Sequence, residues 1–291
     1  MFGFLNINKP QNCTSHDVVV ATRKLLGVKK IGHSGTLDPF ATGVLIIGIN
    51  EATRLFEYLP KDKVYSLEIT FGIETDTNDI TWKVIKEDKN IPGLNEVTNK
   101  LKNFTGQIKQ KPPIFSAVKI NGQRAYSLAR KDQIDLDDLN EKEVEIYSIK
   151  IVSYENKKLK LTIHCSSGTY IRSIARDLGK TLNTCAVLSA LERIKIGNCF
   201  SITQSINLES IDKLTMQEHL ISPISVLGIP KIKLDPKQIE DIYHGRSINI
   251  ETEICHGMSL LADNNDRLLA IGTSCGNGII KPEKVFLKNG K

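Results

Sequence analysis

The chain has 291 residues and 40% of them are hydrophobic, so two domains with a sizeable core are a fair expectation. Its formal net charge of +6 permits a polyanionic partner without identifying one, because many unrelated soluble proteins are equally basic. The six cysteines are scattered, which excludes the close spacing of a zinc or redox motif and indicates free thiols in a reducing compartment.

The N-terminal region predicts a strand followed by a helix. The strand covers Phe4–Asn8, and Thr14 and Asp17 have the capping-box spacing that starts a helix, with Gly27 as its stop. No secretion signal is expected, since polar residues follow Leu5 at once, and no apolar run approaches membrane-spanning length. We therefore expect a cytoplasmic protein.

Periodic apolar residues predict the central elements of the chain. In order, these are a buried strand over Val44–Ile49, a helix over Glu51–Leu59, a half-buried strand over Val64–Phe71, a helix from Leu94, a half-buried strand over Leu159–Cys165 and a helix from Ile171. Strands and helices intermix without a strict parallel repeat. This order favours an α+β fold with a mixed, mostly antiparallel central sheet flanked by helices.

Two later segments differ in pattern. Asp132–Glu143 is acidic and lacks a core pattern, so an exposed, mobile excursion is expected over about 122–145. Near Pro223–Pro230 the pattern changes to a short helix and brief strands separated by hairpin signals, which predicts a small β-rich domain. The expected division is a first domain over 1–225 and a second over 228–291.

The most informative stretch is the glycine-containing loop GHSGTLDPFATG, Gly32–Gly43, which presents His33 and Asp38. Pro39 biases Asp38 away from helical dihedrals and can itself begin a short helix that Asp38 caps. On local geometry alone, this capping role is the favoured interpretation. The same geometry also presents a carboxylate for chemistry at the end of the loop.

Six ordered motifs over nearly the whole chain resemble those of the TruB family, the stand-alone bacterial pseudouridine synthases that modify uridine 55 in the T loop of tRNA. The motifs are KPQNCTS (Lys9–Ser15), GHSGTLDPFATG (Gly32–Gly43), EATRLFEYL (Glu51–Leu59), KVYSLEITFGIETDTND (Lys63–Asp79), QKPPIFSAVKINGQRAYSLAR (Gln110–Arg130) and CSSGTYIRSIARDLG (Cys165–Gly179). The resemblance implies a pseudouridine synthase fold with a small PUA-like RNA-binding domain at the C-terminus.

The resemblance also implies the catalytic residues. Asp38 matches the catalytic aspartate, Arg172 the arginine that pairs with it, and Tyr65 the tyrosine that stacks on the target base. Structural alternatives remain open: Tyr65 could end an apolar strand face, and Arg172 could share a solvated basic helix face with Arg176 and Lys180.

Four further positions match residues that bind the substrate or support the site. Tyr170 and Leu191 match residues lining the uridine pocket, His33 a histidine that contacts the flipped RNA, and Lys9 a supporting lysine. Leu191 follows Leu188 at helical spacing and could equally be ordinary core.

The chain also departs from the family pattern. Asn12 stands where glycine is usual, although asparagine tolerates left-handed dihedrals. Serine replaces threonine at Ser34, phenylalanine replaces tyrosine at Phe115, and Glu192 replaces a common arginine.

For two other groups of residues a structural role or only a weak functional signal is expected. Asp76 and Asp79 are favoured as turn formers over metal ligands. In the C-terminal part, a phosphate contact is only modestly favoured by Lys281, Lys284, Lys288 and Lys291.

The implied reaction breaks the N1–C1′ bond, rotates the uracil and joins C5 to C1′. Because this isomerisation needs no redox change or group donor, no metal and no cofactor are expected, and the chain has neither a Walker loop nor a dinucleotide-binding glycine pattern. The implied partner is the T arm of tRNA, without a guide RNA or an obligate protein partner. A non-catalytic tRNA-folding chaperone, a nucleoside or base hydrolase and a guide-RNA particle subunit are the alternatives.

Overall fold

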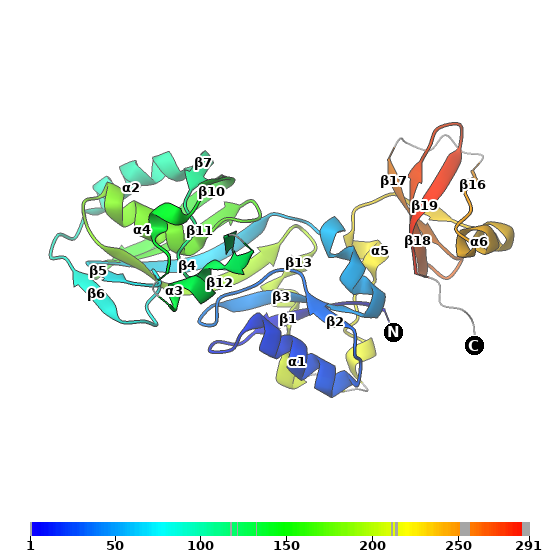
Figure 1. Ribbon diagram of the computed structural model, residues 1–291, viewed down its shortest axis with the longest axis horizontal. Helices are drawn as coiled ribbons and strands as arrows, with labels where there is room; N and C mark the ends of the chain where they lie inside the picture. Colours follow the sequence, from blue (N-terminus) through cyan, green and yellow to red (C-terminus); the bar gives the residue numbers. More distant parts are fainter. Residues whose placement is uncertain are drawn as a thin grey trace.

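The computed structural model of the protein describes residues 2–116, 118–120, 122–131, 133–210, 212, 215–250 and 257–286 (Figure 1). Most strands belong to one large sheet: β1 (Gly3–Lys9), β2 (Ile31–His33), β3 (Thr42–Ile49), β4 (Lys63–Phe71), β7 (Gly106–Gln110), β10 (Lys142–Glu155), β11 (Lys158–Cys165), β12 (Ala186–Ile196), β13 (Phe200–Ser201) and β14 (Ile206–Asn207). A second sheet contains β15 (Lys231–Lys233), β16 (Ile248–Asn249), β17 (Met258–Ala262), β18 (Leu268–Ser274) and β19 (Ile279–Val285). Two hairpins lie outside both sheets, β5 (Ile73–Thr75) with β6 (Val84–Glu87) and β8 (Lys119–Ile120) with β9 (Gln123–Arg124).

The helices are short. The α-helices are α1 (Ser15–Leu26), α2 (Leu94–Leu101), α3 (Ala125–Ala129), α4 (Ile171–Thr181), α5 (Pro223–Val226) and α6 (Pro236–Tyr243). The 3-10 helices are η1 (Asn50–Tyr58), η2 (Lys102–Phe104), η3 (Leu136–Asp138), η4 (Ile202–Gln204), η5 (Leu208–Ser210) and η6 (Thr215–Gln217). None of these described helices is long and apolar enough to cross a membrane.

The large sheet has the strand order β14-β1-β3-β12-β4-β11-β10-β7, with β2 paired to β3 and β13 to β12. Among the pairs that the described residues form in this sheet, β1–β14 and β3–β12 are parallel and the others are antiparallel. The predicted mixed, mostly antiparallel sheet is confirmed. Helix α4 packs on β12, which pairs with β4, so residues from distant parts of the sequence share one apolar cluster there.

Local sequence signals specify several elements correctly. Thr14 and Asp17 form a complete capping box at the start of α1, and Gly27 ends the helix in the left-handed conformation at φ 64°. In β4 and β11 the alternating apolar residues are buried, Cys165 among them. Asn12 adopts φ 63°, the left-handed conformation that lets asparagine stand in place of glycine.

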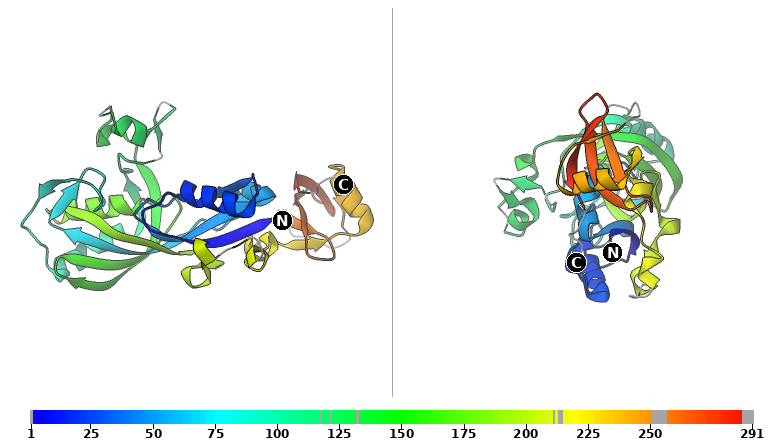
Figure 2. Two further views of the ribbon diagram at one scale, coloured as in Figure 1. Left: turned by 90° about the horizontal axis from the view of Figure 1, so that it is seen from below. Right: turned by 90° about the vertical axis from the view of Figure 1, so that its right-hand side faces the viewer.

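The acidic excursion contains a small apolar cluster that its sequence pattern did not reveal. The segment leaves the large sheet after β7 and returns at β10, and Figure 2 shows it projecting from the body of the molecule. Ala125 and Ala129 of α3 are buried in one cluster with Ile134 and Leu139. The apolar spacing is irregular because the segment folds back on itself through turns, so no single period reveals the cluster.

The small C-terminal sheet packs against the first part of the chain (Figure 1). One apolar cluster joins Phe4 of β1 and Leu55 of η1 to Leu260, Ile271 and Phe286 of the C-terminal part. Polar contacts accompany it. Arg54 donates to the Val285 carbonyl at 3.1 Å, and the Lys284 ammonium pairs with Glu57.

These contacts alter the expectation for the C-terminal lysines. Lys284 is already used at the contact with η1, whereas Lys281 is exposed. Lys288 and Lys291 lie outside the described residues, as does Cys255.

Candidate active site

Asp38 lies at the start of a β-turn between β2 and β3. The Ala41 amide donates to the Asp38 carbonyl at 3.1 Å, with Pro39 and Phe40 at the centre of the turn. Aspartate followed by proline is favourable at the first two positions of such a turn. No helix follows, so the capping role that local geometry favoured for Asp38 is wrong. The turn leads directly into β3.

The loop that carries Asp38 is fastened to the N-terminal elements by buried polar groups. The Lys9 ammonium, fully buried, donates to the carbonyls of Pro10 at 2.9 Å, Cys13 at 2.7 Å and Pro39 at 3.2 Å. The Leu37 amide donates to the Ser15 hydroxyl at 2.9 Å. Burial lowers the pKa of Lys9, and the Asp38 carboxylate opposes that shift.

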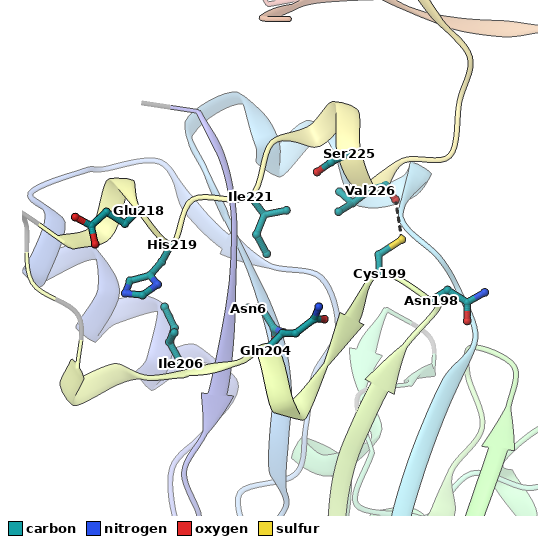
Figure 3. A pocket seen from close by; sticks show the side chains of 10 residues that line it. All are labelled: Asn6, Asn198, Cys199, Gln204, Ile206, Glu218, His219, Ile221, Ser225 and Val226. Atoms are coloured by element: carbon teal, nitrogen blue, oxygen red, sulfur yellow. Dashed lines mark hydrogen bonds between the residues drawn. The ribbon is translucent and has the colours of Figure 1, made fainter.

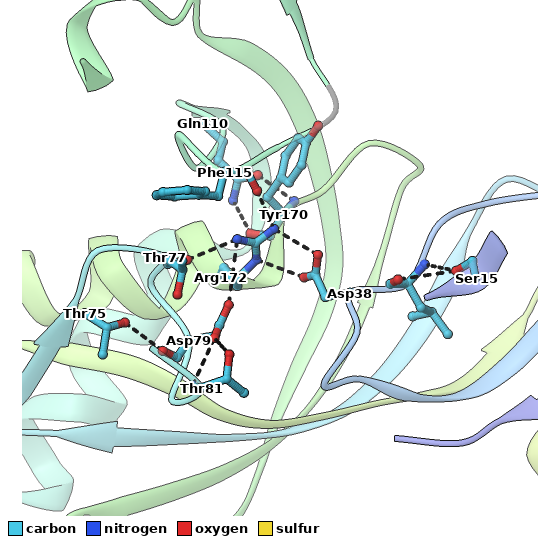
Figure 4. Close-up of polar contacts among 11 residues, drawn as sticks. Ser15, Asp38, Thr75, Thr77, Asp79, Thr81, Gln110, Phe115, Tyr170 and Arg172 are labelled. Carbon is cyan, nitrogen blue, oxygen red and sulfur yellow. Dashed lines mark hydrogen bonds and ion pairs between the residues drawn. The ribbon is translucent and has the colours of Figure 1, made fainter. Parts of the chain in front are cut away.

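Arg172, near the start of α4, holds the Asp38 carboxylate from the opposite side (Figure 4). Its Nε and Nη2 atoms donate to Oδ2 and Oδ1 of Asp38, each at 2.9 Å. Nη1 donates to the Thr77 carbonyl and Nη2 also to the Phe115 carbonyl, both at 3.0 Å. Such a two-point pair fixes both the direction and the distance of the carboxylate.

The exposure of the two partners differs. Arg172 is 6% exposed and Arg176 likewise, so the solvated basic face considered for this helix is wrong for both; only Lys180 is exposed. The Asp38 side chain is 30% exposed. The carboxylate is therefore accessible from solvent while the guanidinium behind it is not.

The N-terminus of α4 is positioned by β7 through Gln110. The Gln110 amide group donates to the Tyr170 carbonyl at 3.0 Å and accepts from the Tyr170 amide at 2.8 Å (Figure 4). The residue after Gln110 makes a second contact with α4, because the Lys111 carbonyl accepts from the Ser173 hydroxyl at 2.8 Å. The ring of Tyr170 is half-buried, and burial raises the pKa of its hydroxyl. Gln110 thus fixes the backbone two residues before Arg172 and thereby the position of Arg172 beside Asp38.

Tyr65 and Leu191 lie on neighbouring strands, β4 and β12, in the apolar cluster that also contains Leu37 and Phe40 of the Asp38 loop. Tyr65 is only 7% exposed, and burial raises the pKa of its hydroxyl. Its hydroxyl is therefore shielded from water.

Leu191 reaches this cluster through a break in strand register. The pairing of β12 with β4 shifts between Leu188 and Ala190, so Ser189 is an extra residue. Leu188 and Leu191 therefore face the same cluster although they are three residues apart in a strand. The spacing that suggested a helix is produced by this bulge.

Arg193 is a site residue that the sequence analysis missed. It is 1% exposed, and its guanidinium donates to the carbonyls of Val44 at 2.8 Å and Gly35 at 3.1 Å. Arg193 also interacts with Tyr65. Burial raises the pKa of the Tyr65 hydroxyl, and the nearby guanidinium partly offsets that rise. Strand alternation places positions 191 and 193 on one face, so an arginine at a buried position of a strand was the available signal.

His33 lies in β2 rather than in the loop, and the structure brings it beside Arg193 rather than beside Asp38. Burial and the Arg193 charge lower the pKa of the imidazole. Its Nδ1 atom is buried and has no hydrogen-bond partner among the described residues.

Asp79 is a turn former, as favoured, and it also contacts the site. Its Oδ1 accepts from the amide of Thr81 at 3.1 Å and from the Thr81 hydroxyl at 2.5 Å. Oδ2 lies 3.9 Å from Nη1 of Arg172. The charge of Arg172 is thus shared between Asp38 and Asp79, which the sequence pattern did not indicate.

A cavity of about 530 Å³ lies elsewhere, between β1, the turn after β12 and the segment that precedes α5 (Figure 3). Asn6, Cys199 and His219 are among its lining residues. None of the residues predicted for the site lines it. The chemistry-bearing groups converge instead on the edge where α4 meets the Asp38 loop.

Comparison with known proteins gives consistent matches. The sequence profile described as "TruB family pseudouridylate synthase (N terminal domain)" matches residues 23–171. The chain is 43% identical to "tRNA pseudouridine synthase B" of Microcystis aeruginosa over 283 residues, which cover 94% of each chain. It is 39% identical to the protein of the same name from Thermosipho melanesiensis, covering 86% of this chain and 82% of that one.

Solved structures show the same fold at lower identity. The structure titled "Crystal Structure of a Cbf5-Nop10-Gar1 Complex" aligns with a TM-score of 0.70 at 25% identity, covering 98% of this chain and 85% of that one. An H/ACA RNP bound to a substrate RNA aligns with a TM-score of 0.70 at 22% identity, over 99% and 86% of the two chains. Because the profile covers half of the chain and the curated relatives align over nearly all of it, the chain belongs to the TruB family of pseudouridylate synthases.

Proposed function

We propose that this tRNA pseudouridine synthase converts uridine 55 of the T loop to pseudouridine, with Asp38 as the catalytic carboxylate. The observation that carries the proposal is the two-point pair between Asp38 and Arg172, both contacts at 2.9 Å. A carboxylate held in this way, and open to solvent on its other side, is suited to act beside a ribose and a base. The relatives from Microcystis aeruginosa and Thermosipho melanesiensis are named as tRNA pseudouridine synthases, which supports the class of reaction and of substrate.

The reaction asks the enzyme to break the N1–C1′ bond, turn the uracil and join C5 to C1′. The C5 proton leaves to solvent and N1 gains one, so atoms and electrons balance without a co-reactant. Asp38 attacks C1′, attacks C6 or removes a sugar proton; each route requires the ionised carboxylate that Arg172 orients. Arg172 itself acts as a positioning residue.

Tyr65, Leu191 and Tyr170 form the walls against which the flipped uracil packs in this proposal. Unstacking the uridine costs roughly a few kcal/mol, and stacking on an aromatic ring returns about 1–3 kcal/mol. Since Tyr65 is only 7% exposed, the base must displace neighbouring side chains to reach it. His33 contacts the flipped RNA, and Lys9 acts indirectly by holding the loop at Pro39.

The division of labour follows the two sheets. We assign catalysis to residues 1–225 and tRNA binding to a PUA-like domain over 228–291, working in the cytoplasm without guide RNA or an obligate protein partner. Their strands do not pair with each other within the described residues. The exposed Lys281 is available for a phosphate contact, whereas Lys284 serves the contact between the two parts.

The test is tritium release from a T-arm stem–loop whose only C5-labelled uridine is at position 55, with the purified full-length chain and no guide RNA. Release with an intact RNA strand is expected, and it should vanish when the label is moved to a neighbouring uridine. Appearance of free uracil would instead indicate a base hydrolase. Faster RNA folding without release would indicate a chaperone and contradict the proposal.

A further inference from the structure

The only tryptophan of the chain lies half-exposed beside the active site. Trp82 follows the turn that contains Asp79 and Thr81, just before β6. Its side chain is 51% exposed, and its ring stacks on Phe115 with centroids 5.8 Å apart and planes 29° apart. Tryptophan carries the largest apolar surface of any side chain, so half-exposure of this kind calls for an explanation.

Two neighbours of Trp82 link it to Arg172: Phe115, on which its ring stacks, and Thr81, which precedes it in the chain. Phe115, which lies beneath the tryptophan ring, accepts from Arg172 through its backbone carbonyl at 3.0 Å. On the other side, Thr81 is tied to Asp79, whose carboxylate lies 3.9 Å from the same guanidinium (Figure 4). The tryptophan ring is therefore held in place relative to Asp38 without contacting Asp38 itself.

The residues next to Trp82 in the sequence include an exposed apolar side chain and an exposed cation. Ile80 is 41% exposed, and Lys83 is exposed directly after the tryptophan, whereas Lys86 lies opposite Glu74 in the β5–β6 hairpin. An open ring face followed by an ammonium group suits a nucleobase with its phosphate, since bases stack on aromatic rings and phosphates bind ammonium groups.

We propose that Trp82 stacks on an unpaired nucleobase of the RNA next to the uridine that enters the site. The inference rests on the proposed function. When one nucleotide turns out of a loop, its neighbour loses a stacking partner, and Trp82 replaces that partner. Phe115 already immobilises the indole, so little side-chain entropy remains to be lost when the base binds.

Because Trp82 does not contact Asp38, its contribution lies in RNA affinity and not in the chemical step. We expect Trp82→Ala to raise the half-saturating RNA concentration about tenfold, equivalent to about 1.4 kcal/mol, while the saturated single-turnover rate stays within about twofold. Trp82→Phe should recover most of the affinity and Trp82→Leu should not, since leucine preserves apolar packing on Phe115 but has no π face.

Fluorescence provides a direct readout, because Trp82 is the sole tryptophan. Titration of the full-length protein with a T-arm stem–loop should quench its emission, and a blunt duplex of equal length should not. Val152→Ala is the matched control: it removes an apolar side chain that is 59% exposed on β10, outside the segment around Trp82, and should leave RNA affinity unchanged.

Absent quenching by the stem–loop, together with normal turnover, would overturn the inference and leave the proposed function standing. So would Trp82→Ala with unchanged RNA affinity, the result expected if the patch docks a protein instead. Equal affinities of the Phe and Leu variants would also overturn it. Absent turnover in the unmodified protein would count against the proposed function itself.

Discussion

The position and the charge of Asp38 depend on different groups. Lys9 and Ser15 hold the backbone of the loop, and Arg172 holds the carboxylate. Asparagine is also favourable at the first position of a β-turn, so the turn from Asp38 to Ala41 does not require the charge. Charge can therefore be removed without dismantling the loop.

Asp38→Asn should fold and bind tRNA nearly as the unmodified protein does, while tritium release from C5 falls to background. The amide keeps one oxygen for Arg172 but cannot serve as an ionised nucleophile or base. Thermal unfolding, tRNA affinity and single-turnover rate should be measured on one preparation. Near-normal turnover in a well-folded variant would mean that Asp38 serves only the turn.

Substitutions of Tyr65 distinguish a stacking role of its ring from a chemical role of its hydroxyl. Tyr65→Phe retains the aromatic face and should turn over faster than Tyr65→Leu, which does not. The phenylalanine variant also removes a buried hydroxyl next to Arg193, so its stability must be measured alongside. Equal inactivity of two folded variants would assign a chemical role to the hydroxyl.

His33 predicts a pH dependence of stability. Burial and Arg193 lower its pKa from the ordinary 6.5, so below that value the unfolded chain takes up a proton before the folded protein does. The stability contributed by neutral His33 is complete above about 6.5 and is lost as the pH falls to the lower folded pKa. Urea unfolding across this interval should be steeper in pH for the unmodified protein than for His33→Gln. Identical slopes would contradict this origin.

At the scale of elements, the clamp between β7 and α4 is the most testable feature. Gln110→Ala leaves the Tyr170 amide without a partner, whereas the Tyr170 carbonyl still accepts from the amides of Ser173 and Ile174. The unpaired amide should cost about 1–3 kcal/mol of unfolding free energy. Turnover should fall as well, because the start of α4 carries Arg172.

The matched control for the clamp is Gln107→Ala, on an exposed position of the same strand. It should leave stability and turnover almost unchanged. If the two variants lose turnover equally, the loss comes from β7 as a whole and the clamp has no special role.

Local signals predicted those elements whose formation depends on neighbours in sequence. The capping box of α1 and the alternation in β4 are of this kind. The site is predictable only in part. Arg172 and Asp38 were paired through a family resemblance, and the carbonyls of Thr77 and Phe115 that orient Arg172 belong to distant loops with no side-chain signature.

Shifts in strand register could not be predicted from the sequence pattern either. The bulge at Ser189 is visible only when β12 is paired with β4, because an extra residue in a strand imitates helical spacing. Gly43, at φ 103°, has a similar non-local cause: a Cβ there would lie 2.3 Å from the Arg193 carbonyl across the β3–β12 pair. Both features follow from which strands become neighbours.

At the scale of the whole molecule, the apolar contact between the two sheets decides what truncation does. Removal of 228–291 uncovers Phe2 and Arg54, which Phe286 contacts, and opens the apolar cluster that also contains Phe4 and Leu55. We expect a lower unfolding temperature in addition to weaker tRNA binding, with the saturated rate retained at temperatures where the shortened chain is folded. Unchanged affinity with a collapsed rate would contradict the assignment of RNA binding to this part.

A single substitution reports on the same contact without deleting a segment. Phe286→Ala should reduce the unfolding free energy by about 3 kcal/mol, because the ring is buried against Phe2 and under Arg54. Ile279→Ala, on an exposed residue of β19, is its control and should have little effect. Equal effects would show that the ring contributes no more than a surface side chain.

The shared cluster also defines which segments can be exchanged between relatives. A chimera that takes only 228–291 from a homologue would bring a foreign apolar surface to Phe4 and Leu55 and would mismatch the partners of Arg54 and Glu57. Recombination that carries β1 and η1 together with the C-terminal sheet preserves the contact. The unit that can be exchanged between homologues is therefore discontinuous in sequence, with its two parts towards opposite ends of the chain.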